Sequence, residues 1–104
     1  MQLELDDAAE ILAQLGNKTR LRIIRHLVKA GEQGVPVGEI QSALVIPAST
    51  LSHHLRYLRQ VRLISQCREG TVLYCAMNYS IIDAIVVFLT DQCCENSIPG
   101  KIVE

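Results

Sequence analysis

The sequence predicts a mainly α-helical domain with one small β-hairpin, in the order ααααββα, that assembles as a homodimer. Apolar residues recur at helical spacing on both sides of Pro47, two β-prone runs flank Gly70, and residues 80–95 are apolar on nearly all sides. One modest core fits the 104 residues, of which 49% are hydrophobic. We therefore expect a single domain over residues 1–104, with its first and last helices available for dimerisation.

The first two helices are predicted from apolar spacing and from residues that start and stop helices. Apolar residues form a stripe over residues 5–15, and Gly16 is suited to end that helix. Asn17 can cap a second helix, which Gly31 and Gly34 then end. The acidic first turn of the first helix suits the partial positive charge of a helix N-terminus.

A pair of helices joined by a tight turn is predicted between Val37 and Leu63. Pro47 cannot continue the first helix of the pair, restricts the residue before it to extended backbone, and is tolerated ahead of a new helix. Ser49 or Thr50 then offers a hydroxyl that can cap the second helix. This arrangement has the form of a helix-turn-helix.

The second helix of this pair has the composition of a helix that enters the DNA major groove. Its leucines at positions 51, 55 and 58 are expected to face inward, which leaves a polar and basic outer surface. Such a helix supplies base contacts, while basic side chains neutralise phosphates. The candidate DNA-contacting residues on it are Ser49, Thr50, Ser52, His53, Arg56 and Arg59. A helical hairpin with a solvated basic face, binding no DNA, fits the periodicity alone equally well.

Two strands are predicted after this helix. Residues 64–67 and 72–76 would pair as a hairpin, the wing, around a turn at residues 68–71. Arg68 at the tip is positioned to enter an adjacent minor groove or to contact a phosphate, so it joins the candidate DNA-contacting set.

The hairpin carries two cysteines, Cys67 and Cys75. A register with Cys67 opposite Val72 places Cys75 opposite Ile64, on the other face of the pleat. A disulfide between the two is therefore not expected. Both fit small, semi-buried strand residues better than ligands.

A last helix is expected from about Ser80 to Glu95. It is apolar nearly all round, so one face can pack on its own domain while the rest needs another cover. Together with the first helix it would form a two-fold interface. This is the basis for the predicted homodimer.

The net charge of −1 conceals a strong segregation of charge. Basic residues lie mainly between Lys18 and Arg68, whereas acidic residues gather toward both ends, as far as Glu104. DNA affinity depends on local phosphate neutralisation, so this segregation matters more than the total charge. In the basic region, Lys18 and Arg22 are further side chains that could reach phosphates, although a solvated basic face explains them as well.

The sequence also bears on the compartment. No run of residues is long enough to span a bilayer, and the acidic start is unlike a secretory signal. We therefore expect a cytoplasmic protein without membrane partners, in which the four cysteines are free thiols.

Several stretches together resemble a known family. Residues 47–55 (PASTLSHHL), followed by LR at 58–59 and LI at 63–64, resemble the recognition-helix signature of the arsenic- and metal-sensing winged-helix repressors of the ArsR/SmtB type. The other matching stretches are residues 15–23 (LGNKTRLRI), residues 38–40 (GEI) and the hairpin that ends in Tyr74. The resemblance implies a homodimeric repressor that presents two recognition helices to successive major grooves of an inverted-repeat operator.

Adjacent cysteines, Cys93 and Cys94, lie at the end of the predicted last helix. Two sulfurs at a fraying helix end can converge on one soft ion, which makes this pair the candidate metal or metalloid site. The chain departs here from the family pattern, because residues 37–44 contain no cysteine and the last helix contains no histidine. The two metal sites best known in the family therefore cannot be built.

The thiol count favours a trivalent arsenic or antimony species as inducer, with no other cofactor required. Such species are thiophilic and form three bonds, whereas zinc prefers four ligands. A methylated trivalent arsenical already has a bond to carbon and needs only Cys93 and Cys94. Inorganic arsenite would need a third sulfur, from Cys67 or Cys75, if the wing approached the helix end.

Other functions stay open at this point. Cys93 and Cys94 could be incidental, or could sense oxidants or reactive sulfur through intermolecular or mixed disulfides, since neighbouring residues rarely form a disulfide with each other. The chain could also bind DNA without any ligand. An enzyme is the least favoured class, because no Ser/His/Asp or paired-carboxylate arrangement is apparent and the His53-His54 pair lies on the DNA helix.

Overall fold

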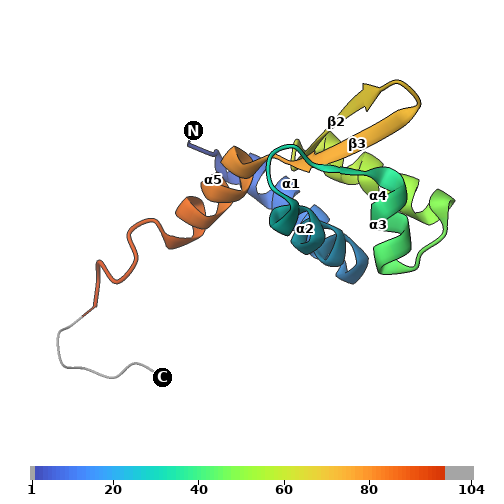
Figure 1. Cartoon of the computed structure of the whole chain (residues 1–104). Coiled ribbons are helices and arrows are strands. Elements are labelled where there is room, and N and C mark those ends of the chain that lie inside the picture. The colour runs from blue at the N-terminus through green and yellow to red at the C-terminus, as the bar shows by residue number, and fades with distance from the viewer. Residues whose placement is uncertain (1, 98–104) are drawn as a thin grey trace.

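The computed structural model describes residues 2–97 and contains helices and strands in the order ααβααββα (Figure 1). The helices are α1 (Leu5–Leu15), α2 (Lys18–Ala30), α3 (Val37–Leu44), α4 (Ala48–Gln60) and α5 (Tyr79–Thr90). The strands are β1 (Val35–Pro36), β2 (Ile64–Glu69) and β3 (Val72–Met77). The expected winged helix-turn-helix is therefore confirmed, with one additional short strand. Glu104, the last of the predicted acidic residues, lies outside the described residues.

The predicted ends of the first two helices are confirmed. Gly16 follows α1 directly, and the Asn17 side chain accepts a hydrogen bond of 3.1 Å from the backbone N–H of Arg20 at the start of α2. Gly31 follows α2 with φ +88°, a left-handed conformation that glycine adopts at little cost.

The predicted cap of α4 is wrong. The helix begins at Ala48 directly after Pro47, and neither Ser49 nor Thr50 makes a capping hydrogen bond, because both already lie in the first helical turn. The preceding turn is made instead by Val45, whose φ of 53° reverses the chain after α3. Pro47 thus sets the start of α4 through its restricted backbone rather than through a side-chain cap.

The strand that the sequence did not reveal is β1, which consists of two residues. It pairs antiparallel with β3, with Val35 opposite Cys75, so that the sheet has the order β1-β3-β2. Gly34 brings the chain there with φ +74°, and a Cβ at this position would collide with the Cys75 carbonyl oxygen. Only glycine allows this close approach, and a two-residue strand is too short to show an alternating pattern.

The predicted register of the hairpin is also wrong. Cys67 lies opposite Tyr74 rather than Val72, and Cys75 lies opposite Gln66. The strands continue to a two-residue turn, because Gly70 adopts φ +61° and permits a tighter reversal than the predicted four-residue turn. Cys67 and Cys75 still lie on opposite faces of the sheet, and both are free thiols, Cys67 exposed and Cys75 buried.

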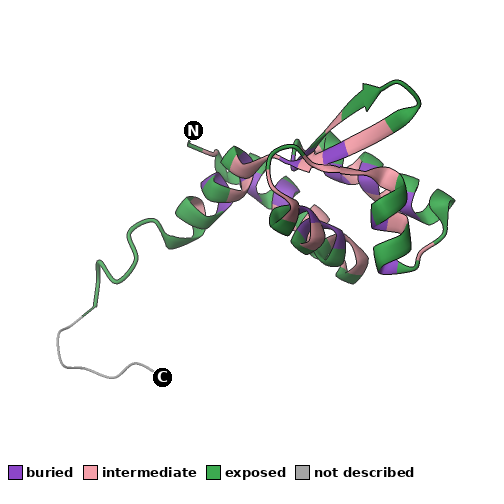
Figure 2. Cartoon of the chain, viewed as in Figure 1, coloured by how far each residue is buried: buried purple, intermediate pink, exposed green. Residues whose placement is uncertain are grey.

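The core lies between the helices and the base of the hairpin, as the buried residues in Figure 2 show. The largest fully buried side chains are Ile23, Leu27, Ile40, Leu51, Leu58, Leu63 and Cys75. The predicted inward leucines of α4 are therefore confirmed. Burying each of them removes enough apolar surface from water to contribute about 1.5–3 kcal/mol.

Helix α5 ends at Thr90, five residues earlier than predicted. The Thr90 hydroxyl donates a 2.7 Å hydrogen bond to the Val86 carbonyl, and turns follow in which Gln92 and Cys94 have φ of 61° and 63°. Backbone of this left-handed kind cannot continue an α-helix. Cys93 and Cys94 therefore follow the helix instead of ending it, in the segment that leads away from the core in Figures 1 and 2. Among residues 2–97, no helix is long and apolar enough to cross a membrane.

Candidate nucleic-acid interface

The outer face of α4 carries the residues that the sequence assigned to DNA. All six of them are exposed, while the leucines of the same helix are buried, which matches the predicted division of the helix into two faces (Figure 2). The six residues are Ser49, Thr50, Ser52, His53, Arg56 and Arg59.

A groove of about 420 Å³ runs between α4 and the hairpin. Its lining combines hydroxyl, imidazole, amide and guanidinium groups that can donate hydrogen bonds to base edges and phosphates. The lining residues are Ser49, Ser52, His53, Leu55, Arg56 and Arg59 from α4, with Gln66 and Leu73 from the strands. The structure therefore brings together five of the predicted residues. Thr50 lies outside the lining, on the first turn of α4, and Arg68 is exposed near the hairpin turn.

Gln66 connects the recognition helix to the hairpin. Its side-chain oxygen accepts a hydrogen bond from Arg59 Nη1, and its Nε2 donates to Cys75 Sγ at 3.2 Å. Burial raises the pKa of the Cys75 thiol, so this sulfur stays protonated at neutral pH. The sequence did not point to Gln66, because the contact exists only in the observed register.

A second set of contacts holds the opposite flank of α4. Arg20 of α2 donates from Nε to His54 Nδ1 at 3.2 Å and from Nη1 to Gln14 Oε1 at 2.8 Å, and its guanidinium lies 4.7 Å from the centre of the Tyr57 ring. Burial, with the nearby positive charge of Arg20, lowers the pKa of His54. The sequence shows Arg20 only as part of the matching stretch at residues 15–23, and does not indicate that it contacts α4.

The two residues of α2 that the sequence offers as phosphate contacts, Lys18 and Arg22, differ in role. Arg22 donates from Nη2 to the Leu44 carbonyl at 3.3 Å and so satisfies an acceptor at the end of α3. Lys18, on the first turn of α2, is exposed. Arg22 thus connects α2 to the helix-turn-helix.

Comparison with known proteins identifies this architecture. A helix-turn-helix domain family matches residues 15–67, which include α2, α3 and α4. The chain is 30% identical over 87 residues to the transcriptional repressor PagR of Bacillus anthracis, covering 84% of this chain and 85% of PagR. It is 33% identical over 90 residues to an SmtB repressor homologue of Synechocystis, covering 84% of this chain and 63% of that protein. The chain belongs to the ArsR/SmtB family of winged helix-turn-helix transcriptional regulators.

A solved structure agrees with this assignment. The homodimeric winged helix-turn-helix DNA-binding domain of a possible ArsR-family regulator from Mycobacterium bovis superposes with a TM-score of 0.66 at 28% identity. The match covers 93% of this chain and 90% of that domain. The relatives of this ArsR/SmtB chain are DNA-binding transcriptional regulators rather than enzymes.

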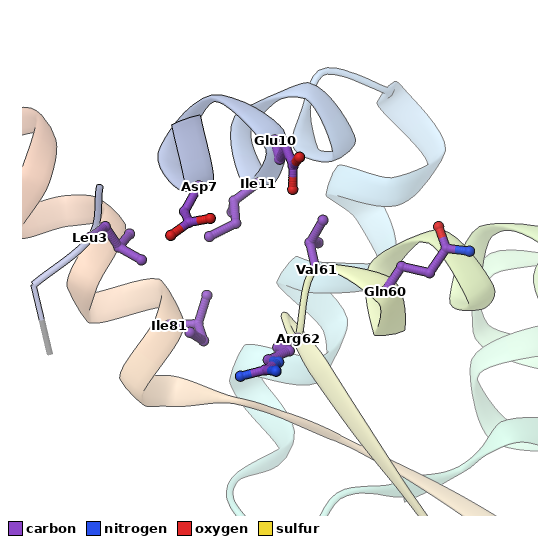
Figure 3. Close-up of a pocket in the computed structure, with 8 residues that line it drawn as sticks. All are labelled: Leu3, Asp7, Glu10, Ile11, Gln60, Val61, Arg62 and Ile81. Carbon is purple, nitrogen blue, oxygen red and sulfur yellow. The ribbon is translucent and has the colours of Figure 1, made fainter. Parts of the chain in front are cut away.

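A second hollow in this ArsR/SmtB chain, of about 360 Å³, lies between α1, the end of α4 and the start of α5 (Figure 3). Asp7 and Glu10 of α1 line it, together with Arg62 just after α4. Two carboxylates repel phosphate, so this hollow is unsuited to contact with DNA. Arg62, although it belongs to the basic central region of the sequence, points into this hollow and thus away from the groove beside α4.

The cysteines of this ArsR/SmtB chain divide into one close pair and two separate residues. Cys93 Sγ and Cys94 Sγ lie 3.4 Å apart, and both residues are exposed. In the part of the chain that the structure describes, no three or more His, Cys, Asp or Glu side chains gather as a metal site. Neither Cys67, exposed on β2, nor buried Cys75 is brought to the pair.

Proposed function

We propose that this chain is a homodimeric transcriptional repressor that releases an inverted-repeat DNA operator when a trivalent arsenical binds Cys93 and Cys94. The observation that carries the inducer site is the 3.4 Å separation of two exposed sulfur atoms. Both sulfurs lie in a short turn segment directly after α5, where a ligand can reach them without opening the core.

The DNA-binding part of the proposal rests on the groove beside α4. Arg56 and Arg59 supply positive charge, and Ser52 and His53 supply donors that fit base edges in the major groove. Arg68, exposed near the hairpin turn, would extend the contact to a phosphate or the adjacent minor groove. Two relatives, PagR and the SmtB homologue, are named as repressors, which supports repression as the outcome.

The dimer is proposed from the apolar residues that α1 and α5 leave uncovered. Val86, Val87 and Leu89 of α5 are 55%, 62% and 61% exposed, and Leu5 of α1 is 71% exposed. Such side chains gathered on two helices are typical of a covered interface. A second copy of the chain is the proposed cover, by analogy with the homodimeric domain from M. bovis.

The chemistry of the cysteine pair favours an organic arsenical. Trivalent arsenic binds soft thiolates, and a methylated species needs only two of them. Cys75 is a poor third ligand, because burial raises the pKa of its thiol and Gln66 already donates to its sulfur. Arsenite or antimonite would require Cys67 or another thiolate to complete three bonds.

The proposed coupling runs through the interface. An arsenic atom that bridges the two sulfurs locks the segment after α5 in one conformation, and so alters the contact between α5 and the second copy. The spacing of the two recognition helices then no longer matches successive major grooves. A 100-fold loss of operator affinity would correspond to a coupling free energy of about 2.7 kcal/mol.

One titration tests the proposal. A DNA duplex selected by the protein from a random pool is bound, and its release is measured against methylarsenite, arsenite, antimonite, zinc, cadmium and peroxide. We expect release by methylarsenite at the lowest concentration, with no release from the double variant Cys93→Ser, Cys94→Ser. Release by peroxide but by no arsenical would replace the proposal with redox sensing. Full arsenical release from the double variant would place the inducer site elsewhere.

A further inference from the structure

Arg20 lies where α1, α2 and α4 meet. From α2 it reaches back to Gln14 near the end of α1, donating from Nη1 to the side-chain oxygen at 2.8 Å and to the backbone carbonyl at 3.4 Å. It reaches forward to α4, where Nε donates to His54 Nδ1 at 3.2 Å. Its guanidinium also lies over the Tyr57 ring, 4.7 Å from the ring centre. One side chain therefore joins the first helix of the domain to the recognition helix.

We infer that Arg20 positions the recognition helix for DNA, and that it does so only while His54 is neutral, so that operator affinity falls when His54 becomes protonated. The inference rests on the proposed role of α4 in DNA binding. It is independent of the cysteine pair and of any inducer.

The link between Arg20 and the DNA-contacting side chains is the Tyr57 ring. His53 meets this ring edge-on, with ring centres 4.9 Å apart, and the Arg56 guanidinium lies 5.5 Å from its centre. Both His53 and Arg56 line the groove beside α4. Stacking of Arg20 on Tyr57 therefore fixes the ring against which two groove residues rest.

The geometry requires an arginine. A planar guanidinium can stack on an aromatic ring and donate two hydrogen bonds in different directions at the same time, whereas a lysine ammonium is a point charge on a flexible stem. Within residues 2–97 Arg20 contacts no carboxylate, so all the Arg20 contacts seen are to neutral groups. A change of charge on one of these groups alters the whole arrangement.

His54 is the partner whose charge can change. Nδ1 accepts the Arg20 hydrogen bond only in the neutral imidazole, because both ring nitrogens of a protonated histidine are donors. Protonation would also set two cations within hydrogen-bonding distance. The charged or titratable groups that face His54 are Arg20 from α2 and His53 from its own helix. Burial, the Arg20 charge and the His53 charge all lower the pKa of His54, which keeps the contact intact at neutral pH.

The sign of the pH dependence separates this inference from simple charge attraction. A histidine that merely acquires charge near DNA attracts phosphate, so affinity would rise as the pH falls. Loss of the Arg20 contact has the opposite effect, because the groove residues lose their support. A fall in affinity below about pH 6.5, the ordinary pKa of histidine, is the expected result.

The experiment measures binding of the full chain to the selected DNA duplex by fluorescence anisotropy, from pH 5 to 8 at constant ionic strength. For the unmodified protein we expect affinity to fall about tenfold over the range in which His54 titrates. His54→Gln, which cannot be protonated, should flatten the profile. Arg20→Lys keeps the charge but not the planar fork, so it should weaken binding about tenfold at pH 7.5. Arg25→Lys, an exposed position on the same helix, is the matched control and should bind like the unmodified protein.

A second measurement does not depend on DNA. The His54 ring resonances are followed by NMR against pH in the unmodified protein and in Arg20→Lys and Gln14→Ala. Loosening the Arg20 contact should move the pKa of His54 toward its ordinary value in both variants. The inference is overturned if affinity rises as the pH falls, if His54→Gln keeps the original profile, or if the pKa of His54 is the same in all three proteins. Failure of arsenical release would leave these results unaffected, whereas absence of DNA binding at pH 7.5 would remove the proposed function itself.

Discussion

The recognition helix and the cysteine pair are held in opposite ways. Helix α4 is fixed from the core side by three buried leucines, on one flank by Arg20 and on the other by Gln66. Cys93 and Cys94 lie in turns whose hydrogen bonds are local, such as Cys93 N–H to the Thr90 carbonyl at 2.9 Å. Preorganisation lowers the cost of binding DNA, whereas a loosely held segment can be rearranged by a small ligand. The contrast fits a division of labour in which the rigid α4 contacts DNA and the loosely held cysteine segment binds the inducer.

The largest expected difference between the two regions is in stability. Leu58→Ala, at a fully buried position of α4, should lower the free energy of unfolding by about 2–5 kcal/mol because it leaves a cavity. Gln92→Ala, at an exposed position beside the cysteine pair, should change it by no more than about 0.5 kcal/mol. Urea denaturation at one fixed protein concentration measures both. Similar losses from the two substitutions would mean that the segment after α5 is as tightly packed as α4.

The next difference concerns the response to methylarsenite. Cys93→Ser and Cys94→Ser should each keep DNA binding but no longer respond to methylarsenite. In the unmodified protein methylarsenite should lower operator affinity about 100-fold, equivalent to about 2.7 kcal/mol of coupling. Cys67→Ser, which changes an exposed thiol away from the pair, is the matched control and should keep both properties. Cys75→Ser should also keep them. Loss of the response in Cys67→Ser alone would indicate a three-thiol site that recruits the wing.

Substitutions in α4 and the hairpin should affect DNA affinity in two distinguishable ways. Arg56→Ala should weaken operator binding strongly, and Ser52→Ala or His53→Ala should alter base preference at a cost of about 1–3 kcal/mol for a true base contact. Arg68→Ala should instead reduce affinity for all sequences and lower the salt dependence by about one unit of slope. Binding curves on several duplexes and at several salt concentrations separate the two effects. Unchanged affinity and salt slope in the triple variant Arg56→Ala, Arg59→Ala, Arg68→Ala would show that α4 does not contact DNA.

Local patterns in the sequence were sufficient for most of the fold. Helical spacing and end signals such as Gly16 and Asn17 depend only on nearby residues, so α1 and α2 were predicted with their ends. The hairpin register and β1 depend on long-range pairing and on positive φ at Gly34 and Gly70, which spacing does not reveal. The apolar run of α5 gives no sign of the turn after Thr90, so the sequence alone places the end of this helix too late.

The candidate site, like the fold, has a part that the sequence predicts and a part that it does not. Exposed positions on α4 follow from the helical period, so the groove residues could be named from the sequence. Other residues hold α4 in place through contacts between distant parts of the chain. Two of their hydrogen bonds join residues 7 and 34 positions apart, and one guanidinium stacks on a ring of another helix. These residues are Arg20, His54, Tyr57 and Gln66. Polar residues of this kind have no periodic signature, and only the packed structure shows which of them meet.

The smallest predicted effect concerns the start of the helix that carries Arg20. The Asn17 side chain accepts a hydrogen bond from the Arg20 backbone N–H, so the cap fixes the very residue that braces α4. Asn17→Ala should lower the free energy of unfolding by about 1 kcal/mol, the usual loss for an N-cap, because that N–H loses its partner. Asn17→Asp keeps an acceptor at the same place and should retain the stability, which urea denaturation can compare directly. Equal losses in both variants would mean that the amide of Asn17 acts through some contact other than the cap. The support that Arg20 gives to α4 would then not depend on the capped start of α2.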